Sequence, residues 1–100
     1  MRVRHYTRVS SMRRIVAEQR IRARDQNKVF VELADRRRLA PNDAEDRYGL
    51  DHGKGNACVE FDVEPEVLLS QYNSRMQLNE YFVIGDIELV TRNAEAFFNF

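Results

Sequence analysis

The sequence has few of the residues that form disulfides or bind metal ions. Of its 100 residues one is cysteine, two are histidine and none is tryptophan. Cys58 has no second cysteine to pair with, so the core must hold the fold without an internal disulfide. The two distant histidines do not have zinc or iron spacing, and no glycine-rich phosphate loop is present. A disulfide scaffold, a metal site and a P-loop enzyme are therefore not expected.

Long apolar runs are also missing. No stretch approaches the roughly 20 apolar residues of a membrane-spanning helix, and the arginine-rich start lacks the apolar run of a secretion signal. With 43% hydrophobic and 32% charged residues, the chain fits one compact domain over residues 1–100. We expect no membrane partner, and any export would depend on something other than these residues.

The net charge of zero conceals an asymmetry between the two halves. Residues 1–50 hold 13 Lys or Arg and 7 Asp or Glu, a net charge of +6, whereas residues 51–100 hold 3 and 9, a net charge of −6. The two halves should therefore attract each other. Arginines cluster at positions 20, 22 and 24 and at positions 36–38. These clusters could bind the phosphates of a nucleotide or nucleic acid, or they could be solvated surface paired with the acidic half.

The alternation of apolar and polar residues predicts an α+β domain with a central, mainly antiparallel sheet and two or three short helices. The helix starting at Pro41 has acidic residues in its first turn and ends at Gly49, as expected for capped helices. The segment 50–56 is expected to be the most flexible, either as a loop covering a ligand or as a plain surface turn. Strands are predicted at residues 1–7, 20–23, 29–33, 57–63, 81–84, 87–90 and 96–100, and helices at 12–19, 41–48 and 64–72.

Cys58 lies inside a strand that alternates apolar and polar residues. His52 is near it in sequence and could act with it as a nucleophilic pair. The position within a half-buried strand favours a buried structural thiol instead.

Three segments carry a resemblance to a known family. They are Arg4-His5-Tyr6-Thr7 with the helix that follows, Val29-Phe30-Val31-Glu32 followed by the helix 41–48, and Glu80 immediately before the strand 81–84. In this order they resemble the small ADP-ribosyltransferase toxin domains, diphtheria-toxin-like, whose active site combines a histidine, an aromatic residue and an acid. The resemblance spans nearly the whole chain and implies an ADP-ribosyltransferase-like fold with NAD as substrate.

The same resemblance implies a role for individual residues. NAD would lie against His5, Tyr6 and Thr7, with His5 bonded to the ribose or the amide and the backbone of Tyr6 holding the carboxamide. Tyr48, or as second choice Phe30, would stack on the nicotinamide ring. The alternatives are that His5 is a satisfied core histidine and that either aromatic residue is ordinary core.

Glu80 is the expected catalytic acid. Breaking the bond between ribose and nicotinamide develops positive charge on the sugar, which a nearby carboxylate stabilises. Asp86 and Glu88 compete for this role, although Asp86 fits a turn and Glu88 should face solvent. Transferases that modify arginine carry an acid or glutamine two residues before the catalytic acid, and here that position is Leu78, which puts arginine modification in doubt.

The resemblance also implies partners. The pyrophosphate of NAD could be held by Arg4, Arg22 or Arg24 through bidentate contacts. A secreted bacterial toxin acting in the target-cell cytoplasm would need a cognate immunity protein in its producer. Its acceptor could be a protein, a nucleic acid or, in plain NAD hydrolysis, water.

Two other function classes remain open on the sequence. A small toxin ribonuclease would use His5 or His52 as general base or acid, with arginines on the RNA backbone. A noncatalytic module would bind a partner protein through an exposed sheet edge or through the terminal segment 97–100.

Overall fold

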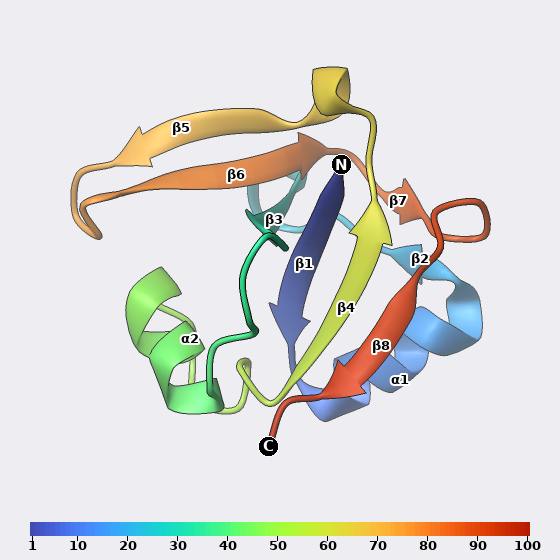
Figure 1. Ribbon diagram of the computed structural model, residues 1–100, viewed down its shortest axis with the longest axis horizontal. Helices are drawn as coiled ribbons and strands as arrows, with labels where there is room; N and C mark the ends of the chain where they lie inside the picture. The colour runs from blue at the N-terminus through green and yellow to red at the C-terminus, as the bar shows by residue number, and fades with distance from the viewer.

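Strands and short helices alternate along residues 1–100 in the computed structural model (Figure 1). The α+β prediction is confirmed, with six strands in the central sheet and two α-helices. Neither helix is long and apolar enough to cross a membrane. The elements are β1 (Arg2–Thr7), α1 (Val9–Glu18), β2 (Arg20–Ile21), β3 (Lys28–Leu33), α2 (Pro41–Tyr48), β4 (Ala57–Asp62), β5 (Leu69–Asn73), β6 (Leu78–Ile84), β7 (Ile87–Glu88) and β8 (Glu95–Phe98), with 3₁₀ turns at Asp25–Asn27 and Pro65–Val67.

The central sheet has the strand order β5-β6-β3-β1-β4-β8, and every neighbouring pair is antiparallel. Strands β2 and β7 form a separate two-stranded ribbon. In Figure 1 the hairpin of β5 and β6 runs across the direction of β1, β4 and β8, and α2 lies below this hairpin. The sheet is therefore strongly twisted, as antiparallel sheets with a right-handed strand twist are.

A fork opens between β1 and β3. The two strands pair only at Val3 with Leu33 and at Arg4 with Glu32. On its other side β1 pairs with β4 along its whole length, from Arg2 to Thr7. From His5 onward, the edge of β1 that faces β3 has no partner strand.

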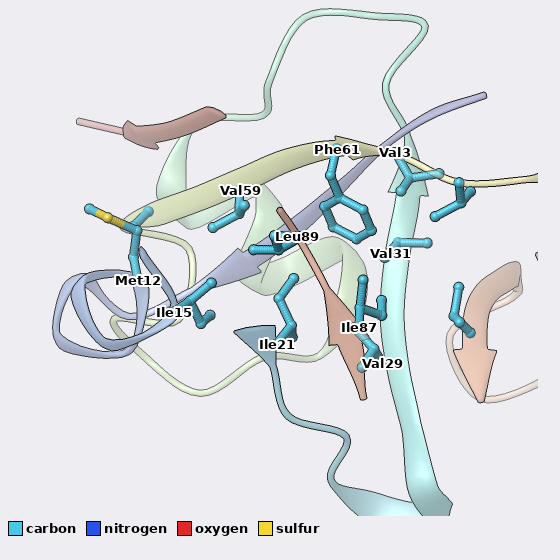
Figure 2. Packing of buried hydrophobic residues seen from close by; sticks show 13 residues of the cluster. Val3, Met12, Ile15, Ile21, Val29, Val31, Val59, Phe61, Ile87 and Leu89 are labelled. Atoms are coloured by element: carbon cyan, nitrogen blue, oxygen red, sulfur yellow. The ribbon is translucent and has the colours of Figure 1, made fainter. Parts of the chain in front are cut away.

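The two faces of the sheet bury different clusters. Thirteen apolar residues form the main core against α1 and the β2–β7 ribbon, with Phe61 completely buried near its centre (Figure 2). On the opposite face a small cluster of Tyr6, Ala44 and Cys58 packs under α2. Burial raises the pKa of the Cys58 thiol to about 11, which confirms the expected buried thiol and disfavours a reactive thiolate at neutral pH.

Ion pairs join the two halves of the chain, as the charge asymmetry predicts. Arg2 contacts Asp62 and Glu95 at 3.1 and 2.9 Å. Arg4 contacts Glu60 at 2.7 Å. Arg20 contacts Glu88 at 2.6 Å. Together these ion pairs connect the basic first half of the chain to the acidic second half.

The helix predicted at residues 64–72 is wrong. Pro65 begins only a 3₁₀ turn, and Leu69–Asn73 forms strand β5, which pairs with β6. The apolar spacing around Leu68 looks helical locally, but the hairpin partner decides the conformation. Strand β6 begins at Leu78, so Glu80 lies within the strand and not before it. The strand predicted at 87–90 is also shorter than expected.

Residues 50–56 form a series of turns that the buried carboxylate of Glu45 holds in place. It accepts hydrogen bonds from the backbone N–H groups of Gly53 and Gly55, at 3.0 and 3.2 Å. Burial of this carboxylate is favourable because both donors are fixed. The loop that sequence patterns mark as flexible is thus tied to α2.

Gly55 makes the closest approach in this loop. A Cβ at Gly55 would lie 2.3 Å from the carbonyl oxygen of Pro41 and 3.0 Å from its Cα. Backbone atoms at the start of a helix cannot turn away as a flexible side chain can. We expect Gly55→Ala to lower the free energy of unfolding by about 2–3 kcal/mol in urea denaturation. Gly85→Ala, where a Cβ meets nothing within 4 Å and only the positive φ is strained, should cost about 1 kcal/mol. Equal losses in the two variants would contradict the steric argument.

Candidate functional site

A cleft of about 400 Å³ lies at the fork between β1 and β3. This volume is within the range of pockets that bind small molecules. The loop after α2 and strand β6 also contribute to its walls. All six residues predicted for the site line this cleft: His5, Tyr6, Thr7, Phe30, Tyr48 and Glu80.

His5 lies where the strands separate. Its Nδ1 is 2.8 Å from the carbonyl oxygen of Phe30, so the side chain replaces a missing backbone contact between β1 and β3. A carbonyl only accepts, so Nδ1 carries the hydrogen. Burial, opposed by this hydrogen bond and supported by the charge of Arg24, lowers the pKa of His5 below its ordinary value. The ring is therefore neutral at pH 7, and its Nε2 is free to accept a hydrogen bond.

The neutral His5 gives a prediction for acid stability. The unfolded chain takes up a proton near pH 6.5, but the folded chain resists it, so stability is full above that pH and falls as the pH drops below it. We expect the free energy of unfolding to decrease between pH 7 and 5, by roughly 1.4 kcal/mol per unit of pKa difference. Urea denaturation of His5→Gln should show a flatter pH profile. An unchanged slope in His5→Gln would contradict the assignment.

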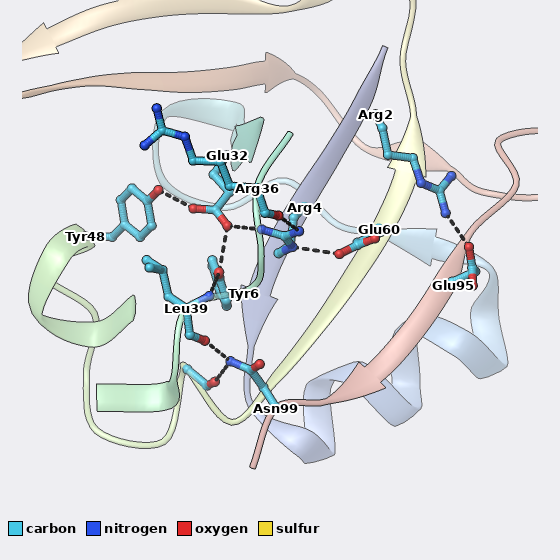
Figure 3. A network of polar contacts seen from close by, with 11 residues as sticks. Arg2, Arg4, Tyr6, Glu32, Arg36, Leu39, Tyr48, Glu60, Glu95 and Asn99 are labelled. Atoms are coloured by element: carbon cyan, nitrogen blue, oxygen red, sulfur yellow. Dashed lines mark hydrogen bonds and ion pairs between the residues drawn. The ribbon is translucent and has the colours of Figure 1, made fainter. Parts of the chain in front are cut away.

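Glu32 connects the elements around the cleft (Figure 3). One carboxylate oxygen accepts a hydrogen bond from the Tyr6 hydroxyl at 2.6 Å and pairs with Arg4. The other oxygen accepts from the Tyr48 hydroxyl. The hydroxyl of Tyr6 in turn accepts from the backbone N–H of Leu39 at 2.9 Å. A single carboxylate on β3 thus connects β1, α2 and the segment between β3 and α2 in one network.

This network raises the pKa of both tyrosines. Burial and the hydrogen bond to Glu32 raise the pKa of Tyr6 to about 12, and the same two causes raise that of Tyr48. Both hydroxyls therefore stay protonated and act as donors at neutral pH. The rings of Tyr6 and Tyr48 lie 6.1 Å apart and are tilted by 33°, which fits an aromatic pair.

Phe30 offers a second aromatic face. Its ring is 40% exposed in the cleft wall and packs against Phe82 at 6.0 Å between centroids. Tyr48, in contrast, is half-buried and fixed through its hydroxyl. Both candidates for stacking on a ligand ring lie in the cleft, with Phe30 the more exposed.

Among the three acids considered from the sequence, only Glu80 lines the cleft. Its two carboxylate oxygens accept hydrogen bonds from Gln71 and Asn73 of β5, at 2.9 and 2.7 Å. Asp86 accepts instead from the backbone of Ala23, and Glu88 pairs with Arg20. The side-chain amides of β5 therefore fix the carboxylate of Glu80 at the cleft wall.

Arg4 does not fit the role of phosphate ligand. It is 3% exposed, and its guanidinium donates to Glu60, Glu32 and the carbonyl oxygen of Arg36. Burial alone would lower the pKa of Arg4, but the hydrogen bonds to Glu60 and Glu32 raise it. The predicted pyrophosphate contact from Arg4 is therefore disfavoured, because each of its three guanidinium nitrogens already donates inside the protein.

Other cations remain around the cleft. Arg24 lines it and takes part in no ion pair, whereas Arg22 also lines it but pairs with Glu18 at 2.9 Å. Arg8, Lys28 and Lys54 also line it, with Lys54 3.6 Å from a carboxylate oxygen of Asp51. No group of three or more His, Cys, Asp or Glu side chains is arranged to hold a metal ion. The cleft lining thus carries six Lys or Arg side chains beside four carboxylates, those of Asp25, Glu32, Asp51 and Glu80.

Sequence reasoning missed the central role of Glu32. The residue alternates with Val29 and Val31 on β3, a pattern that normally places a glutamate in solvent. Only the register of Arg4 with Glu32 and the approach of Tyr48 bring its partners together. His52 does not line the cleft, so the two histidines are not brought together there.

A twisted antiparallel sheet that forks at its centre, and a cleft lined by histidine, aromatic and carboxylate side chains, make up the fold and candidate site of this α+β domain. A family model described as the HYD1 signature containing ADP-ribosyltransferase matches residues 3–91. The chain therefore belongs to this family of toxin ADP-ribosyltransferases. No curated protein and no solved structure matches it. The family resemblance is confirmed, and the roles of individual residues stay predictions.

Proposed function

We propose that this toxin domain cleaves the bond between nicotinamide and ribose in NAD and transfers ADP-ribose to a macromolecule or to water. The observation that supports this is the convergence of His5, Tyr6, Thr7, Phe30, Tyr48 and Glu80 on one cleft. These residues come from four separate elements of the chain, β1, β3, α2 and β6. A ligand in the cleft would meet a strand edge, aromatic rings, a fixed carboxylate and several cations.

The nicotinamide end of NAD would lie at the fork. From His5 onward β1 has no partner strand on this side, so backbone groups there are available to a carboxamide. The Nε2 of His5 would accept a hydrogen bond from a ribose hydroxyl. Phe30 or Tyr48 would stack on the nicotinamide ring, which is worth about 1 kcal/mol beyond burial.

Glu80 would act where positive charge develops. As the bond from the anomeric carbon to nicotinamide breaks, nicotinamide leaves with the electron pair and the sugar becomes cationic. A carboxylate held by Gln71 and Asn73 cannot turn away, so it would stabilise this state without reorganising. The acceptor then bonds to the anomeric carbon and loses its proton to solvent.

The basic lining would hold the pyrophosphate. Arg24 is the leading candidate because it lines the cleft and takes part in no ion pair. Guanidinium groups bind phosphate oxygens in pairs, which lysine does less well. Arg22 would have to leave Glu18 to contribute.

The biological setting that fits this activity is a secreted effector. Such a toxin would act in the cytoplasm of a target cell and would be held inactive in its producer by a cognate immunity protein. The acceptor would be a protein or a nucleic acid. The toxin family supports this setting in general terms.

The test is incubation of the purified protein with NAD, followed by chromatography of nicotinamide and ADP-ribose. Release of nicotinamide is expected, and free ADP-ribose in equal amount would indicate hydrolysis. Less free ADP-ribose than nicotinamide, once cell extract is added, would indicate transfer to an acceptor. The Glu80→Gln variant, shown to be folded by circular dichroism, controls for contaminating enzymes. No release with or without extract would contradict the proposal, and RNA cleavage would then be assayed.

A further inference from the structure

A second hollow lies between the segment after β3 and the C-terminal strand. Arg37 and Arg38 line it on one side, and Phe98 and Phe100 line it on the other. Arg4 is common to this hollow and to the NAD cleft, so the two sites adjoin. We call the surface formed by these two arginines and two phenylalanines the arginine–phenylalanine surface.

Its phenylalanines are unusually exposed. Phe98 is 53% and Phe100 82% accessible, and their rings lie 6.1 Å apart with a tilt of 51°. The neighbouring Phe97 is covered by the guanidinium of Arg38, 4.1 Å above its ring. The arrangement offers two aromatic faces to a ligand beside a positive group.

Arg37 and Arg38 have no carboxylate partner inside the protein. Arg37 and Arg38 are exposed and take part in no ion pair, although five other arginines pair with acids. Arg36 and Arg13 are likewise exposed and outside any ion pair, and Arg13 lies 6.0 Å from the ring of Phe98. Positive charge without an internal partner favours an external polyanion.

Asn99 fixes the two sides of the hollow to each other. Its side-chain amide donates to the carbonyl oxygens of Leu39, at 2.7 Å, and Gly55, at 2.9 Å. Its backbone N–H donates to Asn56 at 2.8 Å. Leu39 directly follows Arg38, and Asn99 stands between the two phenylalanines. The backbone segments that carry the rings and the guanidinium groups are thus held together, which lowers the entropy cost of binding.

We propose that the arginine–phenylalanine surface binds single-stranded nucleic acid. Unpaired bases stack on Phe98 and Phe100, and the phosphates between them contact Arg37 and Arg38. A duplex hides its base faces and gains only the phosphate contacts. If the proposed function holds, the bound strand also supplies the acceptor of ADP-ribose. Its site adjoins the cleft, because Arg4 lines both.

The test is fluorescence anisotropy of labelled single-stranded RNA and DNA oligonucleotides of roughly 12 nucleotides, a length within reach of such surfaces. Arg37→Glu with Arg38→Glu, and Phe98→Ala with Phe100→Ala, should each weaken binding at least tenfold. Arg14→Glu with Arg75→Glu makes the same charge change at exposed arginines outside any ion pair and outside the hollow, and should weaken binding less than threefold. Matching duplexes should bind more weakly, and the alanine pair should not affect them.

Three outcomes would overturn the proposal. They are absence of binding by the wild-type protein, an equal loss in the control variant, and a phenylalanine pair without effect on single strands. Either of the last two outcomes would mean that nucleic acid is held only by unspecific charge attraction, or that the surface binds a protein instead. Because binding is measured without NAD, its failure is distinct from failure of nicotinamide release. All variants should still release nicotinamide from NAD in water.

Discussion

Replacing Glu80 by glutamine is expected to slow nicotinamide release by about 10²–10³-fold, the cost of removing one preorganised group that stabilises transition-state charge. The amide has the same shape, and its oxygen can still accept a hydrogen bond from Gln71 or Asn73. The free energy of unfolding should therefore change by less than about 1 kcal/mol. Single-turnover release of nicotinamide and urea denaturation measure the two quantities separately.

Glu88→Gln is the matched control. Glu88 is an exposed glutamate that pairs with Arg20 outside the cleft, so its loss should leave the rate within about twofold. Glu32→Gln tests the other glutamate in the cleft wall. An unchanged rate in Glu80→Gln, with loss of activity in Glu32→Gln at preserved stability, would move the catalytic acid from β6 to β3.

Replacing Arg4 by methionine is expected to lower the free energy of unfolding by about 3–5 kcal/mol at pH 7. Glu32 and Glu60 have side chains only 13% and 16% exposed, and both face the guanidinium of Arg4. Without it, two carboxylates stand close together in a poorly solvated place. Urea denaturation gives the loss directly, since a small domain of this size is expected to unfold in one step.

Arg2→Met provides the comparison on the same strand. Arg2 also contacts two acids, but its side chain is 26% exposed and theirs are 44% and 64% exposed. Solvent screens such pairs, so the loss should be at most about 1 kcal/mol. Adding Glu60→Gln to the Arg4 variant should recover part of its stability. A loss below 1 kcal/mol in Arg4→Met would show that the buried pair is not needed.

The sequence was informative where local chemistry decides the structure. Pro41 and Gly49 bound α2 as predicted, and Gly49 takes the left-handed conformation, with φ of 63°, that ends many helices. Alternation correctly located β4, with Phe61 facing the core. His5, which the family resemblance places against the ligand, lines the cleft.

The sequence was uninformative where distant segments decide the outcome. Strand β5 exists because β6 pairs with it, and nothing local distinguishes Leu69–Asn73 from the end of a helix. The sequence did not show the internal partners of Arg4, because Glu32 and Glu60 are 28 and 56 residues away. The network around Glu32 could not be predicted for the same reason. Its partners Arg4, Tyr6 and Tyr48 are distant in sequence and come together only in the folded sheet.

The fork between β1 and β3 also bears on solubility. A strand edge without a partner normally invites other chains to add to the sheet, and proteins protect such edges at the rim. Here the rim strands are β5 and β8, while the unpaired stretch of β1 beyond Arg4 lies in the middle of the sheet. Neighbouring strands on both sides keep another chain from reaching it. The protein can therefore keep open backbone groups for a small ligand without the risk of aggregation that an exposed edge carries.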